Sequence, residues 1–259
     1  MNISPDLSVI VPSIRVFNLP ALYETIQKSC DPHTFEMIVV SPYEITVDLL
    51  NKPNVKYLQD LGCPSRCVQR GSTIAEGHLL MWLSDDCVSS KPGSLGECIS
   101  LFQNGTITEK DAICLRYVEG DNDESVFPDA YWIAHTHPDQ RLPSVPSHFS
   151  IAPLGMYSLS FFRSIGGLDC RWEHINYNLH DLAFRTQRNG GTIHLSPSYC
   201  AKFRWSWFDA ESTPVQEAWR NNDKDLFAQV YSQDQSQRVK IDYDNWKQSP
   251  ERWVRRFGK

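Results

Sequence analysis

The chain has 259 residues, a length that allows one large α/β domain or two small ones. Apolar residues make up 41% of the sequence and charged residues 22%, which excludes a disordered chain and is typical of a globular protein with a core. The formal net charge of −6 argues against a protein whose main partner is nucleic acid, because such proteins usually carry a basic surface.

The sequence shows neither a membrane-spanning segment nor a cysteine pattern typical of disulfides or zinc sites. No apolar run approaches the ~20 residues of a transmembrane helix, and no signal segment is expected at the start. The eight cysteines are scattered, and the closest pair, Cys63 and Cys67, lacks the spacing of a zinc site. These features predict reduced thiols and a cytoplasmic protein.

The first half of the chain alternates strand-like and helix-like segments. Four short apolar runs predict buried strands: Leu7–Pro12, Met37–Val40, Val55–Leu58 and Leu79–Leu83. One helix is predicted after Asn18, with Pro20 in its first turn, and another over residues 65–76, with Gly77 as its C-cap. This alternation predicts an α/β fold, Rossmann-like, with a mostly parallel central sheet and helices on both faces.

The second half is less regular. Residues 112–117 and 192–195 are predicted strands, residues 159–165 and 178–188 predicted helices, and the tail from Pro214 onward is helical by pattern. The intervening stretch, residues 119–150, is predicted to be a functional loop because irregular segments of this length are rarely filler.

The sharpest chemical signal is the pair Asp85 and Asp86, which directly follows an apolar strand. In a parallel sheet, ligands bind beyond the carboxyl ends of the strands. Two carboxylates at that edge suit a Mg²⁺ or Mn²⁺ ion that also binds the phosphates of a nucleotide. The alternative is an Asp-rich turn or a cap for the segment that follows.

Several motifs in order resemble family-two glycosyltransferases: Leu7–Pro12, Phe35–Val40, Gly77–Asp86, Ile165–Asp169 and Asp181–Arg185. The chain resembles their GT-A fold over about residues 7–203. The resemblance implies sugar transfer from a nucleotide-diphosphate sugar, with Mn²⁺ or Mg²⁺ as cofactor. It implies that Asp86 is the metal ligand of a DxD-type motif, and that Asp85 contacts the ribose or contributes to the metal shell.

The resemblance also divides the chain. Residues 1–205 would form the GT-A domain, with 1–105 as its nucleotide-sugar-binding half and 106–205 as its acceptor half, and residues 206–259 a helical C-terminal extension. The residues expected to bind the nucleotide sugar are Pro12, Ser13, Arg15, Ser41, Arg66, Ser84 and Asp85. Ser84 stands where the motif usually has an acidic residue, and Ser41 where the family often has an aspartate that contacts the base. For Arg15 and Arg66 the alternative is a surface arginine.

The acceptor side departs from the family pattern. Leu179 stands at the position of the usual catalytic base, and leucine cannot accept a proton. Asp181 is therefore the predicted base, with His180 and Glu173 as other candidates and a helix-capping role with Asn178 as the alternative. The residues expected to bind the acceptor are Asp169, Trp172, Glu173 and His180.

Together these patterns predict a metal-dependent glycosyltransferase that moves a sugar, with inversion, from a donor expected to be a UDP-sugar to an acceptor hydroxyl. The acceptor would be a glycan, a lipid-linked glycan or a modified nucleic acid. Transfer to a hydroxymethylated base in DNA is an alternative, for which the only hint is a basic tail comprising Arg252, Arg255, Arg256 and Lys259. A nucleotidyltransferase is disfavoured because residues 13–16 contain no glycine, whereas Leu179 favours a non-catalytic nucleotide-sugar-binding module.

Overall fold

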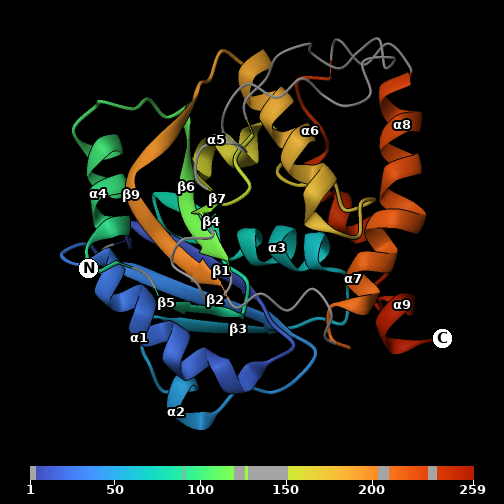
Figure 1. Ribbon diagram of the computed structural model, residues 1–259, viewed down its shortest axis with the longest axis horizontal. Helices are drawn as coiled ribbons and strands as arrows, with labels where there is room; N and C mark the ends of the chain where they lie inside the picture. The colour runs from blue at the N-terminus through green and yellow to red at the C-terminus, as the bar shows by residue number, and fades with distance from the viewer. Residues whose placement is uncertain (1–3, 90, 120–125, 128–150, 204–209, 233–237) are drawn as a thin grey trace.

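The computed structural model describes residues 4–89, 91–119, 126–127, 151–203, 210–232 and 238–259. These residues form a nine-stranded sheet in the order β3-β2-β1-β4-β8-β6-β9-β5, with β7 paired to β6 (Figure 1). The strands are β1 (Leu7–Pro12), β2 (Phe35–Ser41), β3 (Val55–Gln59), β4 (Leu79–Trp82), β5 (Cys87–Ser89), β6 (Ala112–Glu119), β7 (Val126–Phe127), β8 (Gly155–Ser158) and β9 (Ile193–Phe203).

The strand directions confirm the predicted α/β class. β3, β2, β1 and β4 are parallel neighbours, and β6 is parallel to β9. β8 lies between β4 and β6 and is antiparallel to both, while β5 and β7 are antiparallel edge additions. Most strands therefore run in one direction, and their carboxyl ends share one edge of the sheet.

Helices cover both faces of this sheet. The α-helices are α1 (Leu19–Cys30), α2 (Val47–Leu50), α3 (Pro64–Thr73), α4 (Ser94–Gln103), α5 (Leu159–Ser164), α6 (Ile175–Arg188), α7 (Thr213–Ala218), α8 (Lys224–Ser232) and α9 (Val254–Phe257). Short 3₁₀ segments span Val16–Asn18 and Tyr243–Gln248, and a π-helical turn, Trp219–Asp223, joins α7 to α8. Within the described residues, no helix is long and apolar enough to cross a membrane.

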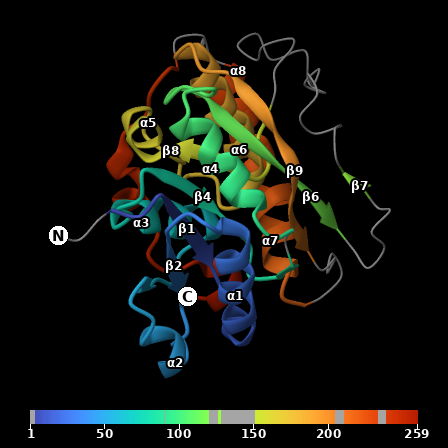
Figure 2. The same ribbon diagram turned by 90° about the vertical axis from the view of Figure 1, so that its left-hand side faces the viewer.

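The core has two layers because side chains alternate along each strand. On β1, Ile10 packs on the face covered by α3, α5, α6 and α8, whereas Val9 and Val11 pack on the face covered by α1 and α4. Figures 1 and 2 show these helices on opposite sides of the sheet. The burial of strand residues on both faces explains why the strands read as continuous apolar runs in the sequence.

Several predicted boundaries were wrong. α3 ends at Thr73, and Gly77 is not its C-cap. Gly77 instead lies against β1, where its N–H donates to the Ser8 hydroxyl at 2.8 Å and a Cβ atom would come within 2.6 Å of the Ser8 nitrogen. α6 begins at Ile175 with His174 as its N-cap, so the alternative in which Asn178 and Asp181 cap this helix does not occur. β9 extends to Phe203, well beyond the predicted strand.

The described C-terminal residues pack in two different hydrophobic clusters. Phe227, Val230 and Tyr231 of α8 belong to the same core cluster as α3, α5 and α6. The boundary predicted between residues 205 and 206 lies outside the described residues, as does most of the predicted loop over residues 119–150. α8 therefore contributes to the main core, whereas Ala218 of α7 and Trp253 pack with Cys63 in a small separate cluster.

Candidate functional site at the carboxyl edge of the sheet

The ends of β1, β2, β3 and β4 meet at one edge, and backbone hydrogen bonds continue across it. Ser13 N donates to Val40 O at 3.0 Å, Asp60 N to Ser41 O at 3.1 Å and Leu83 N to Ile10 O at 2.9 Å. Because neighbouring strands lie about 4.8 Å apart, the ends of β1, β2 and β4 bring Pro12, Ser13, Ser41 and Ser84 to adjacent positions. Of these, Ser13 and Ser41 are buried, Pro12 is half-buried and Ser84 is exposed.

Asp85 braces the loop that follows β1. Its Oδ2 accepts from the Ser13 hydroxyl at 3.1 Å and from the backbone N–H groups of Ile14 and Arg15 at 2.9 and 2.7 Å. Its Oδ1 pairs with the Arg15 guanidinium at 2.8 Å, and its carbonyl accepts from the Asn18 amide at 3.0 Å. Both carboxylate oxygens of this buried residue are therefore occupied by the protein itself.

Asp86, unlike Asp85, has a carboxylate oxygen that receives no hydrogen bond from the described residues. Its Oδ1 atom is buried and has no hydrogen-bond partner among the described residues. Burial raises the pKa of this carboxyl group above its usual range; the Asp85 charge adds to the rise, and the Ser84 hydroxyl and Arg15 counter it. A buried carboxylate oxygen without a donor is costly unless a cation or another donor completes it. Asp86 is thus the residue at this edge whose environment fits a metal ion.

Arg66 does not face this edge as a free donor. It is 2% exposed, and its Nε lies 3.1 and 3.2 Å from the two carboxylate oxygens of Asp60. Its Nη1 donates to the carbonyl groups of Trp246 and of Ser249, the latter at 2.9 Å. Arg66 therefore ties the C-terminal segment to the loop after β3.

The predicted base Asp181 lies in the interior. It is fully buried, and Arg185 pairs with its Oδ2 at 2.8 Å. Its Oδ1 accepts from the Tyr231 hydroxyl at 2.6 Å and pairs with the Arg238 Nε at 2.8 Å. Both oxygens are occupied, so this geometry is that of a structural carboxylate and leaves no atom for an acceptor proton.

Asp169 and Trp172 belong to the same interior cluster. Arg238 bridges the carboxylates of Asp169 and Asp181, and Arg171 donates to Asp169 Oδ2 at 2.7 Å. Burial alone would raise the pKa of Asp169, but Arg171 and Arg238 bring it below the usual value. Trp172 is fully buried beside Phe227, with the Arg238 guanidinium 5.4 Å from its ring. The sequence offered no signal for Arg238, because it lies far from both aspartates along the chain.

Glu173 and His180 remain closer to the surface. Glu173 has a side chain that is 24% exposed, and its Oε2 accepts from Trp253 Nε1 and Arg255 Nε, each at 2.6 Å. The half-buried His180 ring lies 6.0 Å from the rings of Tyr177 and Phe227 on α6 and α8. Of the four residues predicted to bind the acceptor, these two are accessible to a ligand.

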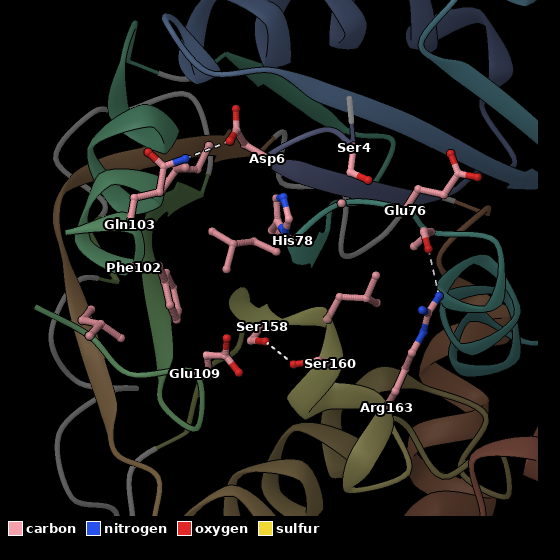
Figure 3. Close-up of a pocket in the computed structure, with 16 residues that line it drawn as sticks. Ser4, Asp6, Glu76, His78, Phe102, Gln103, Glu109, Ser158, Ser160 and Arg163 are labelled. Carbon is pink, nitrogen blue, oxygen red and sulfur yellow. Dashed lines mark hydrogen bonds between the residues drawn. The ribbon is translucent and has the colours of Figure 1, made fainter. Parts of the chain in front are cut away.

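A pocket of about 780 Å³ lies at the other edge of the sheet, at the amino ends of β1 and β4 (Figure 3). Several of its polar groups pair with each other or with nearby carbonyl groups, and no lining side chain among the described residues has a buried polar atom without a partner. Gln103 donates to Asp6 at 2.8 Å, the Ser158 and Ser160 hydroxyls lie 2.9 Å apart, and Arg163 donates to Ser72 O at 2.7 Å. This pocket therefore lacks the unsatisfied polar group that distinguishes the carboxyl edge.

No protein-family model matches the chain, and no curated protein matches it by sequence. Solved structures of S. aureus TarS do match. The crystal structure of TarS is 15% identical with a TM-score of 0.57, over 89% of this chain and 43% of that chain. Structures of TarS 1–349, alone and in complex with UDP-GlcNAc, are each 16% identical, with TM-scores of 0.58 and 0.53 over 71% and 72% of their chains.

These similarities, together with the sheet order, define a glycosyltransferase fold of the GT-A type. The chain spans less than half the length of the first TarS structure. At this level of identity the comparison establishes the fold, and the activity has to be argued from the site.

Proposed function

We propose that the protein is a metal-dependent glycosyltransferase that uses a nucleotide-diphosphate sugar, with a UDP-sugar as donor. The observation that carries this proposal is the buried, unpartnered Oδ1 of Asp86 at the carboxyl edge of the sheet. Support for the donor class comes from a neighbour in fold that was crystallised with UDP-GlcNAc.

The metal would be held by Asp86. Mg²⁺ and Mn²⁺ take oxygen ligands, and with nucleotides they bind one or two carboxylates, phosphate oxygens and water. Asp86 supplies one such carboxylate, whereas Asp85 has both oxygens engaged and serves to hold the Ser13–Arg15 loop. When bound, a divalent ion neutralises charge that develops on the departing diphosphate. The described residues contain no group of three or more His, Cys, Asp or Glu side chains suited to a metal, so the phosphates and water would complete the shell.

The nucleoside would lie over the ends of β1 and β2. Ser41 is buried at the end of β2, and its Oγ accepts from Tyr43 N at 3.0 Å; a serine hydroxyl can donate as well as accept. A serine at this place favours an uncharged contact with a base carbonyl. The proposed donor contacts are therefore Ser13, Ser41 and Ser84, with Pro12 and Arg15 shaping the loop.

Transfer with inversion needs a group that accepts the proton of the attacking hydroxyl. Asp181 is occupied on both oxygens and Leu179 is apolar, so Glu173 and His180 are the remaining candidates for the base. The same observation favours one second candidate function, a module that binds nucleotide sugars without transferring them.

Turnover separates these two functions. Hydrolysis of UDP-GlcNAc to UDP and GlcNAc, with water as the acceptor and Mn²⁺ present, should be measurable for the wild type and should fall by about tenfold or more in Asp86→Asn. Asp225→Asn, at an exposed carboxylate on α8, is the matched control and should keep full activity. Metal-dependent binding of UDP-GlcNAc without UDP release would support the module, and no binding under any metal would contradict both.

A further inference from the structure

Two cysteines that lie far apart in the sequence face each other between α4 and β9. Cys98 on α4 is fully buried, and Cys200 on β9 is 3% exposed. A hydrogen bond joins their thiol groups. The Cys200 Sγ atom also lies 3.8 Å from the carbonyl oxygen of Ser94, which is about one helical turn before Cys98. The two sulfur atoms therefore meet where this helix packs on this strand.

Cys200 occupies an irregular position in its strand. Its neighbours Tyr199 and Ala201 pair with the consecutive residues Arg116 and Tyr117 of β6. Cys200 is therefore the extra residue of a β-bulge, a feature that redirects a side chain and interrupts the ladder of hydrogen bonds. The backbone that carries this thiol is less constrained than the backbone of a regular strand.

The cysteine pair also lies close to an edge of the sheet. β5 is the last strand in the sheet order, has three residues and pairs with β9 at Lys202 and Phe203. Short edge strands open locally at a lower free-energy cost than the centre of a sheet. A small oxidant can therefore reach Cys200 through local opening of this edge, without global unfolding.

The hydrogen bond within the pair decides which thiol ionises first. Cys98 donates to the Cys200 sulfur, which lowers the pKa of Cys200 and raises the pKa of Cys98, although burial and Glu97 act against the lowering. By contrast, burial raises the pKa of Cys63 and Cys114 to about 12. Because the thiolate is the nucleophile in thiol oxidation, Cys200 is the reactive member of the pair.

The contact between α4 and β9 is next to the candidate metal site. The Ser198 hydroxyl donates to Glu97 Oε2 at 2.5 Å and joins the same two elements. Figures 1 and 2 both show α4 alongside β9. β9 also pairs with β5, which begins directly after Asp86. A covalent bond between α4 and β9 would thus fix the strand that supports this end of the site.

We propose that Cys98 and Cys200 form a redox modification site, at which a peroxide converts the two thiols into a disulfide that fixes α4 to β9. The Cys200 sulfur attacks one oxygen of hydrogen peroxide, the O–O bond breaks, and water leaves a sulfenic acid on Cys200. The Cys98 sulfur then attacks the Cys200 sulfur, the S–O bond breaks, and a second water leaves. The peroxide takes two electrons from the thiols, and both thiol protons end in the water molecules.

The test treats the folded full chain with hydrogen peroxide at pH 7, without nucleotide, and then unfolds and alkylates it. Two of the eight thiols should escape alkylation. Mass spectrometry of a non-reducing digest should find the Cys98 and Cys200 peptides joined, with the loss of two hydrogen atoms. The bond restricts the unfolded chain, so the thermal midpoint should rise by about 5 °C. Dithiothreitol should reverse both changes.

Cys98→Ser and Cys200→Ser should each abolish the joined peptides. Cys30→Ser is the matched control, because Cys30 is buried in the same apolar cluster and its pKa is raised by burial and Asp6, not by another thiol. This variant should form the bond as the wild type does. No loss of thiols in the folded wild type, a disulfide between other cysteines, or an unchanged thermal midpoint would overturn the inference. The peptide map of the wild type decides the matter even where a variant fails to fold, and it is independent of UDP release.

Discussion

Two groups of aspartates in this molecule look alike in the sequence and differ in the structure. In the interior group, Asp169 and Asp181 are joined by Arg238, and Arg171, Arg185 and Tyr231 complete their oxygens. At the carboxyl edge, Asp86 has a buried oxygen that accepts no hydrogen bond from a described residue. Both groups hold buried carboxylate oxygens, but only the second leaves one of them without a hydrogen bond from a described residue.

This difference indicates which carboxylates are structural. A buried charge whose hydrogen bonds are all made within the protein stabilises one arrangement of helices and has no capacity left for a ligand. A buried carboxylate oxygen without a hydrogen bond lowers the stability of the folded protein. Such a residue is a candidate for a functional site, where a ligand or metal ion supplies the missing partner. Asp85 shows how narrow the distinction is, because it neighbours Asp86 and is fully occupied.

The largest effect is expected at the interior group. Asp181→Ala would leave Arg185 and Arg238 buried near an uncharged side chain and should lower the free energy of unfolding by about 3–5 kcal/mol. Asp86→Ala should change it by less than about 1 kcal/mol, because no described hydrogen bond is lost at Oδ1 and the hydroxyl that bonds this carboxylate belongs to Ser84, an exposed residue. Urea unfolding at pH 7 measures both, and similar losses would erase the distinction between the two groups.

A smaller effect is expected for Arg66, which the sequence had suggested as a donor contact. Arg66→Lys keeps the charge but loses the forked contacts to Asp60 and the Trp246 and Ser249 carbonyls, and should cost about 2 kcal/mol of stability. Arg70 also pairs with Asp60, but its side chain is 30% exposed. Arg70→Lys should therefore cost less stability than Arg66→Lys. If Arg66→Lys instead weakens UDP-GlcNAc binding with no loss of stability, Arg66 belongs to the donor site.

A still smaller effect is expected for the brace around Asp85. Ser13→Ala removes one hydrogen bond to a carboxylate that keeps the N–H groups of Ile14 and Arg15, and should cost about 1 kcal/mol. The thermal midpoint should fall by only a few degrees. A collapse of stability would show that Asp85 depends on Ser13 far more than its other contacts suggest.

The pH dependence of stability should have opposite signs in the two groups. The pKa of Asp86 is raised in the folded protein, so its ionisation costs stability as pH rises from the unfolded value of 3.8, and Asp86→Asn should gain on the wild type over that range. The pKa of Asp169 is lowered, so its contribution is present above 3.8 and is lost as pH falls below that value. The penalty of Asp169→Asn should therefore shrink in acid. Denaturation curves between pH 3 and 6 test both slopes, and equal signs would contradict the assignment.

The sequence predicted the sheet-forming segments of the first half because they are apolar runs buried on both faces, such as Leu7–Pro12. The metal role of Asp86, inferred from its place after a buried strand, stays a prediction. The sequence could not separate Asp181 from a catalytic base, because the partner Arg238 and the donor Tyr231 come from a distant segment. The position of Gly77 was missed for a similar reason. A glycine after a helical segment looks like a C-cap in the sequence, and its close packing against Ser8 of β1 is visible only in the structure.

The most direct test is a crystal structure with UDP and Mn²⁺, with the metal located by its anomalous signal. The account predicts the uracil and ribose over the ends of β1 and β2 and a Mn²⁺ ion on Asp86 Oδ1, bridged to the diphosphate. UDP bound in the pocket at the amino ends of β1 and β4 (Figure 3), or a metal away from Asp86, would contradict it.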